Sequence, residues 1–173
     1  MKLLTRRLLL KGLFGSAFGL VGGYAVAVEP GFRLRVQPYA LTPPRWTTGP
    51  RLRIAAVADI HAGEPYMSLD RIERIVAATN DLKADLIVLL GDYVAAPEVR
   101  VRTVPSEDWS RALSRLQAPL GGHAILGNAD WWDGAVTCRR ALDRAGIPIL
   151  HNDAVRLVHQ GRGFWLAGPQ EEL

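Results

Sequence analysis

Three short segments of the chain place metal-type ligands directly after apolar runs. They are Asp59-Ile60-His61, Gly91-Asp92 and Gly127-Asn128-Ala129-Asp130. Carboxylate, imidazole and amide oxygen groups together suit borderline and hard divalent ions such as Mn, Fe, Zn or Mg better than a thiolate site would. The three segments therefore predict a site for a divalent metal ion.

The apolar runs in front of these segments predict the strands that position them. Residues 54–58, 86–90 and 124–126 are apolar without polar alternation, which is typical of parallel strands buried on both faces. In an open α/β sheet, ligands bind outside the carboxyl ends of the strands. We therefore expect the three segments to converge on one crevice.

Amphipathic helices are expected between these strands. Ser68 can cap a helix that runs through Asn80, and a second helix begins near Ser106. A third spans about Ala135 to Ala145. Alternating strands and helices predict a βαβ series, and therefore an α/β fold with a parallel sheet.

The ordered motifs resemble those of the calcineurin-like metallophosphoesterases. In that family, the N-terminal half of the domain carries Asp-x-His, then Gly-Asp, then Gly-Asn-His followed by Asp or Glu, each after a core strand. By this resemblance, Asp59 and His61 bind one metal ion, Asp92 bridges both ions, and Asn128 binds the second. The resemblance covers about residues 52–168 and implies a layered βαβ sandwich that is incomplete at the C-terminus of this chain.

The resemblance also implies a reaction, the hydrolysis of a phosphate mono- or diester substrate by a hydrolase with two divalent metal ions. Such a pair can activate a bridging water as hydroxide and stabilise the attacking and leaving oxygens. A bridging carboxylate such as Asp92 offers one oxygen to each ion.

Two departures from the family pattern favour an alternative function. Ala129 stands where the third motif has His, and an alanine cannot give the acid or base help that is typically worth ~10²–10⁴ in rate. No Gly-His-x-His follows Asp130, and we expect the isolated His151 and His159 to be surface or edge residues. No residue is therefore assigned as catalytic, and Asp130 is a candidate for a supporting contact behind the ligands. The alternative is a noncatalytic remnant or interaction module that keeps the fold.

Each motif taken alone also fits a purely structural role, and so do the residues around the third motif. Asp and Asn side chains commonly bond the backbone of turns. Trp131 and Trp132 either pack beneath the rim of the site or form a wall of the substrate pocket. Cys138 is the one cysteine of the chain, so no intramolecular disulfide is available, and we expect it to be buried in a helix.

The N-terminal segment resembles a twin-arginine export signal. Residues 5–11 contain the pair Arg6 and Arg7 followed by apolar positions and Lys11, and residues 12–28 are weakly apolar. Residues 25–27 (Ala-Val-Ala) form a cleavage candidate. We therefore expect residues 1–28 to be a signal peptide or a membrane anchor that engages the export machinery and places the protein in the periplasm or on the outer face of the cytoplasmic membrane.

Composition completes the predicted organisation. Residues 29–50 hold five prolines and predict an extended tether, and residues 51–173 form the N-terminal part of the phosphoesterase domain.

Four of the 21 basic residues lie in the first 11 positions, and the remaining 17 equal the 17 acidic residues. A nucleic-acid binder would show a basic stripe, so we expect no nucleic-acid partner.

Overall fold

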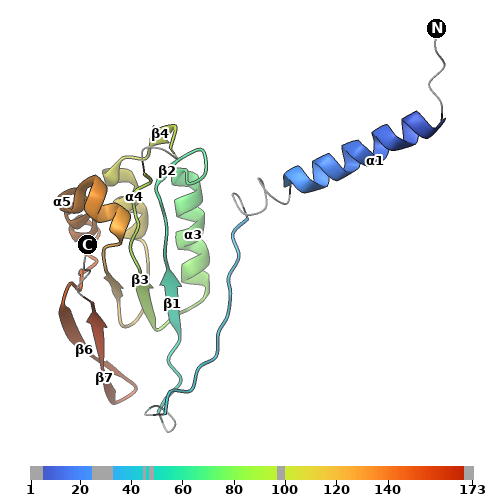
Figure 1. Cartoon of the computed structure of the whole chain (residues 1–173). Helices are drawn as coiled ribbons and strands as arrows, with labels where there is room; N and C mark the ends of the chain where they lie inside the picture. The colour runs from blue at the N-terminus through green and yellow to red at the C-terminus, as the bar shows by residue number, and fades with distance from the viewer. Residues whose placement is uncertain (1–5, 25–32, 45, 47–48, 97–99, 170–173) are drawn as a thin grey trace. The chain divides into compact units, whose positions relative to one another are not determined.

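The computed structural model describes the chain except for residues 1–5, 25–32, 45, 47–48, 97–99 and 170–173 (Figure 1). The chain divides into two compact units, Met1–Tyr39 and Ala40–Leu173. The first unit contains the helix α1 (Arg6–Gly23), and Phe14 and Phe18 on this helix are exposed. None of the helices described is both long enough and apolar enough to cross a membrane. The cleavage candidate at residues 25–27 lies outside the described residues.

A parallel sheet forms the centre of the second unit. Its strands are β1 (Ile54–Val57), β3 (Leu86–Leu89) and β5 (Gly122–Ala124), paired in the order β1-β3-β5 (Figure 1). An isolated parallel bridge between Ala124 and Ile149 extends the sheet beyond β5. The first two strands lie where the apolar runs predict them. The third begins two residues before the predicted run, and its pairing continues as the Ile125 N–H donates to the Leu89 carbonyl.

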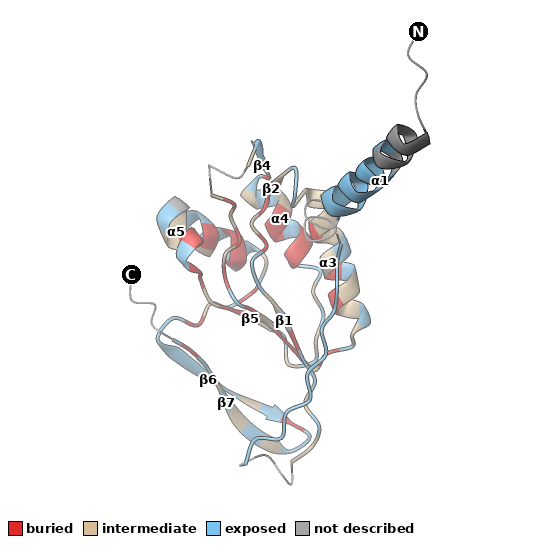
Figure 2. Cartoon of the chain, turned by 45° about the vertical axis from the view of Figure 1, so that its right-hand side comes forward, coloured by how far each residue is buried: buried red, intermediate tan, exposed pale blue. Residues whose placement is uncertain are grey.

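Three helices follow the three strands of the sheet, so that the first two connect successive strands and the third leads from β5 to Ile149. They are α3 (Leu69–Asp81), α4 (Ser106–Leu113) and α5 (Asn128–Arg144), and α4 packs between the other two. Each crossover moves one strand further in the same direction, and right-handed crossovers then place every helix on one face. Figure 2 shows the buried residues of these helices. The hydroxyl of Ser68 caps α3 as predicted, by accepting the Arg71 N–H at 3.3 Å.

The opposite face of the sheet is only partly covered. On β1, Ala55 is buried beneath the helices, whereas Ile54 is 50% exposed and Ala56 is exposed. The prediction that the strands are buried on both faces is therefore wrong for β1, because all three connecting helices lie on the other face. The fold is α/β as predicted, and the described residues supply the layers of an incomplete sandwich.

The last described segment is an antiparallel hairpin of β6 (Asp153–His159) and β7 (Arg162–Gly168). The ring of Trp46 lies 5.6 Å from that of Phe164, with the Arg162 guanidinium 4.6 Å from its centroid. His159 is buried, and its Nε2 lies 2.9 Å from the Arg51 carbonyl oxygen. The expectation of a surface position for His159 is therefore wrong, because the chain before β1 packs against this end of the hairpin, whereas β6 is an edge strand as the alternative expectation had it.

Helix α5 begins earlier than the sequence indicates. The predicted start near Ala135 coincides with a break at Gly134, whose φ of 134° and ψ of 70° are not helical. The preceding turns are helical because Gly127 occupies the N-cap and donates its N–H to the Asp130 carboxylate at 2.9 Å. The third motif therefore occupies the first turn of a helix.

Candidate metal centre

Three of the four predicted ligands lie together. One donor atom each from Asp59, His61 and Asp92 can be chosen so that all lie within 4.8 Å of one another. The Nε2 atom of His61 is 3.6 Å from Asp59 Oδ1 and 3.8 Å from Asp92 Oδ2. Two carboxylates around one imidazole form a donor set that fits a divalent cation of the borderline or hard class.

The carboxyl ends of two neighbouring strands bring these side chains together. Asp59 follows β1 and Asp92 follows β3, and the two loops stay hydrogen-bonded beyond the strands. The Asp59 N–H donates to the Gly91 carbonyl at 3.2 Å, and the His61 N–H donates to the Asp92 carbonyl at 2.8 Å. These three predicted ligands therefore meet at the carboxyl ends of the parallel strands, as expected.

All three of these residues have left-handed backbone conformations. Their φ angles are 55° for Asp59, 43° for His61 and 57° for Asp92. Such conformations are uncommon for residues other than glycine, and strained backbone of this kind clusters at functional sites. Three such residues therefore lie together at this edge of the sheet, although Lys83, Asn152 and Gln160 elsewhere in the chain share this conformation.

Two glycines let the second and third motifs approach each other. A Cβ added to Gly91 would lie 2.2 Å from the Gly127 nitrogen, and one added to Gly127 would lie 2.2 Å from Asp92 Oδ1. The Ala129 N–H donates to that same oxygen at 2.9 Å. Asn128, which is exposed, therefore lies between two residues that contact Asp92. The backbone of the third motif therefore lies against Asp92, and Asn128 as the fourth ligand stays a prediction.

A backbone contact determines which nitrogen of His61 can bind a metal ion. The Nδ1 atom lies 3.1 Å from the Val94 carbonyl oxygen. A carbonyl only accepts hydrogen bonds, so this contact favours the tautomer with the proton on Nδ1, whose Nε2 lone pair lies on the side of Asp59 and Asp92. Sequence reasoning missed Val94, and no residue-type signal could have found it because the contact is made by the backbone.

Asp130 lies behind the cluster and is fully buried at 0% exposure. Burial raises the pKa of its carboxyl group, and the backbone N–H groups bonded to it act in the opposite direction. Tyr93 packs beside it, with its ring stacked on Trp109 at 5.7 Å and its hydroxyl donated to the Ile125 carbonyl at 2.9 Å. Burial, followed by the nearby Asp130 charge, raises the pKa of Tyr93. Sequence reasoning missed Tyr93, because its contacts with Trp109 and Ile125 join segments far apart in sequence.

The remaining candidates around the third motif do not join the cluster. Ala129 is 8% exposed, and Trp132 is 76% exposed. Trp131 is half-buried, with its ring 5.5 Å from the His151 ring and the Arg139 guanidinium 5.2 Å from its centroid. Cys138 is buried in α5 as predicted.

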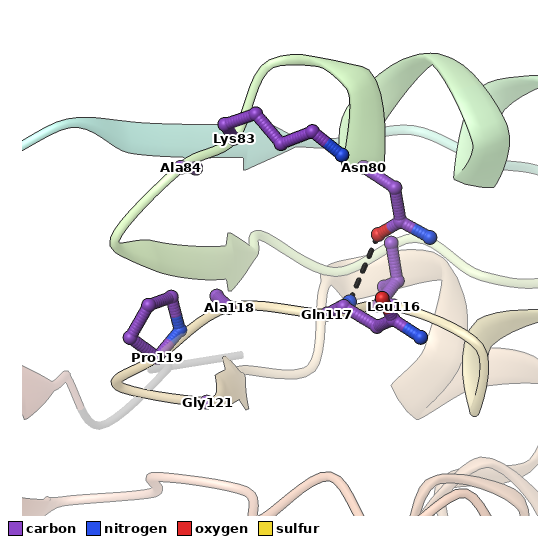
Figure 3. Close-up of a pocket in the computed structure, with 8 residues that line it drawn as sticks. All are labelled: Asn80, Lys83, Ala84, Leu116, Gln117, Ala118, Pro119 and Gly121. Carbon is purple, nitrogen blue, oxygen red and sulfur yellow. Dashed lines mark hydrogen bonds between the residues drawn. The ribbon is translucent and has the colours of Figure 1, made fainter.

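A hollow of about 450 Å³ lies away from the cluster (Figure 3). Lys83 and Ala84 precede β3, and Pro119 and Gly121 precede β5, so the hollow lies at the amino ends of these strands. Asn80 lines it as well and accepts the Gln117 N–H at 2.8 Å. The hollow and the candidate ligands therefore occupy opposite edges of the sheet.

Comparison with known proteins agrees with the motifs. The family model described as Calcineurin-like phosphoesterase matches residues 52–164. An uncharacterized metallophosphoesterase of Aquifex aeolicus (strain VF5) is 30% identical over 139 residues, which are 80% of this chain and 50% of the relative. One from Bacillus subtilis (strain 168) is 27% identical over 168 residues, 88% of this chain and 54% of the relative. The chain thus spans about half the length of these two relatives.

A solved structure, that of the Pseudomonas putida nuclease MPE, matches with a TM-score of 0.36 and 22% identity, over 57% of this chain and 46% of that chain. The family match extends over well more than half of the sequence and contains all four candidate ligands. The chain belongs to the calcineurin-like phosphoesterase family.

Proposed function

We propose that this chain is a metal-dependent phosphoesterase that hydrolyses a phosphate mono- or diester at a dinuclear metal site. The observation that carries the proposal is the grouping of donor atoms from Asp59, His61 and Asp92 within 4.8 Å. Membership of the phosphoesterase family supports the reaction class.

Each residue has a role in this proposal. Asp59 and the Nε2 atom of His61 would hold one ion, and Asn128 would hold the second. Asp92 would bridge the two, because its Oδ2 lies on the His61 side and its Oδ1 accepts the N–H that follows Asn128. Two divalent ions, when bound here, would supply a bridging water activated as hydroxide and neutralise charge on the phosphoryl oxygens.

A noncatalytic remnant or interaction module is the second candidate. Ala129 favours it, because this buried methyl group takes the place of the motif histidine and holds no proton for the leaving group. Four protein ligands shared by two ions are also few, since a structural zinc site alone uses four. These observations predict slow turnover even where metal is bound.

Hydrolysis by the full chain separates the two candidates. Bis(p-nitrophenyl) phosphate and p-nitrophenyl phosphate are offered with Mn²⁺, and release of p-nitrophenolate is followed for the wild type, Asp92→Asn and Asp81→Asn. The phosphoesterase predicts turnover that is lost in Asp92→Asn. It should be kept in Asp81→Asn, which removes an equal charge from an exposed position on α3. Wild-type turnover no faster than that of Asp92→Asn would favour the remnant.

We also propose that the chain is exported by the twin-arginine route to the periplasm, or to the outer face of the cytoplasmic membrane. The Arg6-Arg7 pair at the start of α1, followed by apolar residues, supports this proposal. Replacing both arginines by lysine should keep the protein in the cytoplasmic fraction of cells that have this route. The matched pair Arg33→Lys and Arg35→Lys should be exported as the wild type is. Normal export of the Arg6 and Arg7 variant would refute the proposal.

A further inference from the structure

The Asp130 carboxylate joins two segments that come from different strands. Its Oδ2 accepts the N–H groups of Gly127 at 2.9 Å and Asp92 at 2.8 Å. Its Oδ1 accepts those of Tyr93 at 2.8 Å and Val94 at 3.3 Å. A fully buried carboxylate is expensive to desolvate, and these four donors satisfy both of its oxygens.

The segment 92–94 is hydrogen-bonded both to Asp130 and to the loop that carries His61. Its N–H groups bond Asp130, and its carbonyl groups accept from the other side. The Asp92 and Tyr93 carbonyls accept the N–H groups of His61 and Ala62, at 2.8 and 2.7 Å, and the Val94 carbonyl contacts His61 Nδ1 at 3.1 Å. The segment is therefore a backbone bridge between the buried carboxylate and the imidazole.

We propose that Asp130 is a positioning residue of the metal site, which holds the segment 92–94 so that the Val94 carbonyl fixes the tautomer of His61 and the Asp92 carboxylate faces the cluster. This inference rests on the proposed metal site. Asp130 itself touches no ligand position with its side chain beyond the Asp92 backbone N–H, and acts through the segment it holds.

An amide at this position cannot accept all four of these hydrogen bonds. Both oxygens of Asp130 receive two backbone donors each. Asp130→Asn has nearly the same shape, but its NH₂ group would face two N–H donors and accept from neither. Whichever way the amide is turned, two of the four backbone N–H groups then lose their acceptor.

The first readout is the tautomer of His61 in the metal-free full chain, from ring ¹⁵N chemical shifts and two-bond ¹H–¹⁵N correlations. The wild type should be predominantly protonated at Nδ1, and Asp130→Asn should mix the two tautomers. Mn²⁺ affinity measured by calorimetry should fall 10–100-fold in Asp130→Asn, the typical effect of losing a residue that orients ligands.

Leu142→Ala is the matched control, because it opens a cavity elsewhere on the same helix and leaves the bonds of segment 92–94 in place. It should lower Tm while keeping both the His61 tautomer and the Mn²⁺ affinity. A folded Asp130→Asn variant with the wild-type tautomer and affinity would overturn the inference.

Should Asp130→Asn not fold, the wild-type spectrum decides. Predominant protonation at Nδ1 supports the inference, and predominant protonation at Nε2 overturns it. The tautomer is read without metal or turnover. Failure of the proposed function, a wild type that binds no Mn²⁺, is therefore distinct from failure of this inference.

Discussion

Replacing Asp59 by glycine should leave the metal-free protein more stable than replacing it by alanine, and both changes should weaken its response to metal. The side chain of Asp59 is 69% exposed, and its φ of 55° is costly for any residue with a Cβ. That cost is about 1–2 kcal/mol, whereas glycine gives back roughly 0.4–1 kcal/mol through its freer unfolded chain. The net gain over Asp59→Ala is then about 0.5–1 kcal/mol, because both variants remove the carboxylate and only alanine keeps the strain.

Thermal melts of the full chain in EDTA and in Mn²⁺ provide the assay. For a unit of this size, 1 kcal/mol shifts Tm by roughly 4 °C, so in EDTA Asp59→Gly should melt about 2–4 °C above Asp59→Ala. Mn²⁺ at 100 times its Kd should stabilise the wild type by about 2.7 kcal/mol, or ~10 °C. Both Asp59 variants should gain clearly less.

Lys83→Gly is the matched control for backbone strain. Lys83 has a φ of 49°, is exposed, and lies at the opposite edge of the sheet from the ligands. In EDTA, Lys83→Gly should likewise melt about 2–4 °C above Lys83→Ala, and both Lys83 variants should keep the full response to Mn²⁺. The reasoning is refuted if Asp59→Gly is no more stable than Asp59→Ala in EDTA, or if either keeps the wild-type gain in Mn²⁺.

Two further predictions concern the close contact between two loops and the pH dependence of stability. Gly127→Ala should lower Tm by roughly 4–12 °C, the effect of about 1–3 kcal/mol of overpacking, because its Cβ would lie 2.2 Å from Asp92 Oδ1. Gly122→Ala, where a Cβ meets nothing within 4 Å, should change Tm little, and equal losses in the two would contradict this account. Burial lowers the pKa of His123 in the folded state, so unfolding takes up a proton as pH falls through the ordinary histidine pKa of about 6.5. The urea midpoint should therefore fall between pH 7.5 and 5.5 by more in the wild type than in His123→Gln, and parallel losses would show that His123 is not the cause.

Local signals in the sequence were enough for much of the fold and for most of the site. The apolar runs located β1 and β3, and Ser68 marked the start of α3, because strand burial and helix capping depend on residues close in sequence. Residue type and order were enough to select Asp59, His61 and Asp92, which the structure brings together.

Features that depend on tertiary contacts could not be predicted in this way. The contact between Gly91 and Gly127 and the contact of Val94 with His61 join segments far apart in sequence through the backbone. The break at Gly134 concealed the first turns of α5. The partly exposed face of β1 depends on which layers are present around the sheet, and an apolar strand sequence does not record that.

The stoichiometry of metal binding tests the central claim most directly. The full chain is titrated with Mn²⁺ by calorimetry, and the metal retained after gel filtration is counted, for the wild type and for Asp92→Asn. The account predicts two ions per wild-type chain and at most one, bound more weakly, in the variant. A wild type that binds no Mn²⁺, or a variant that binds as the wild type does, would contradict it.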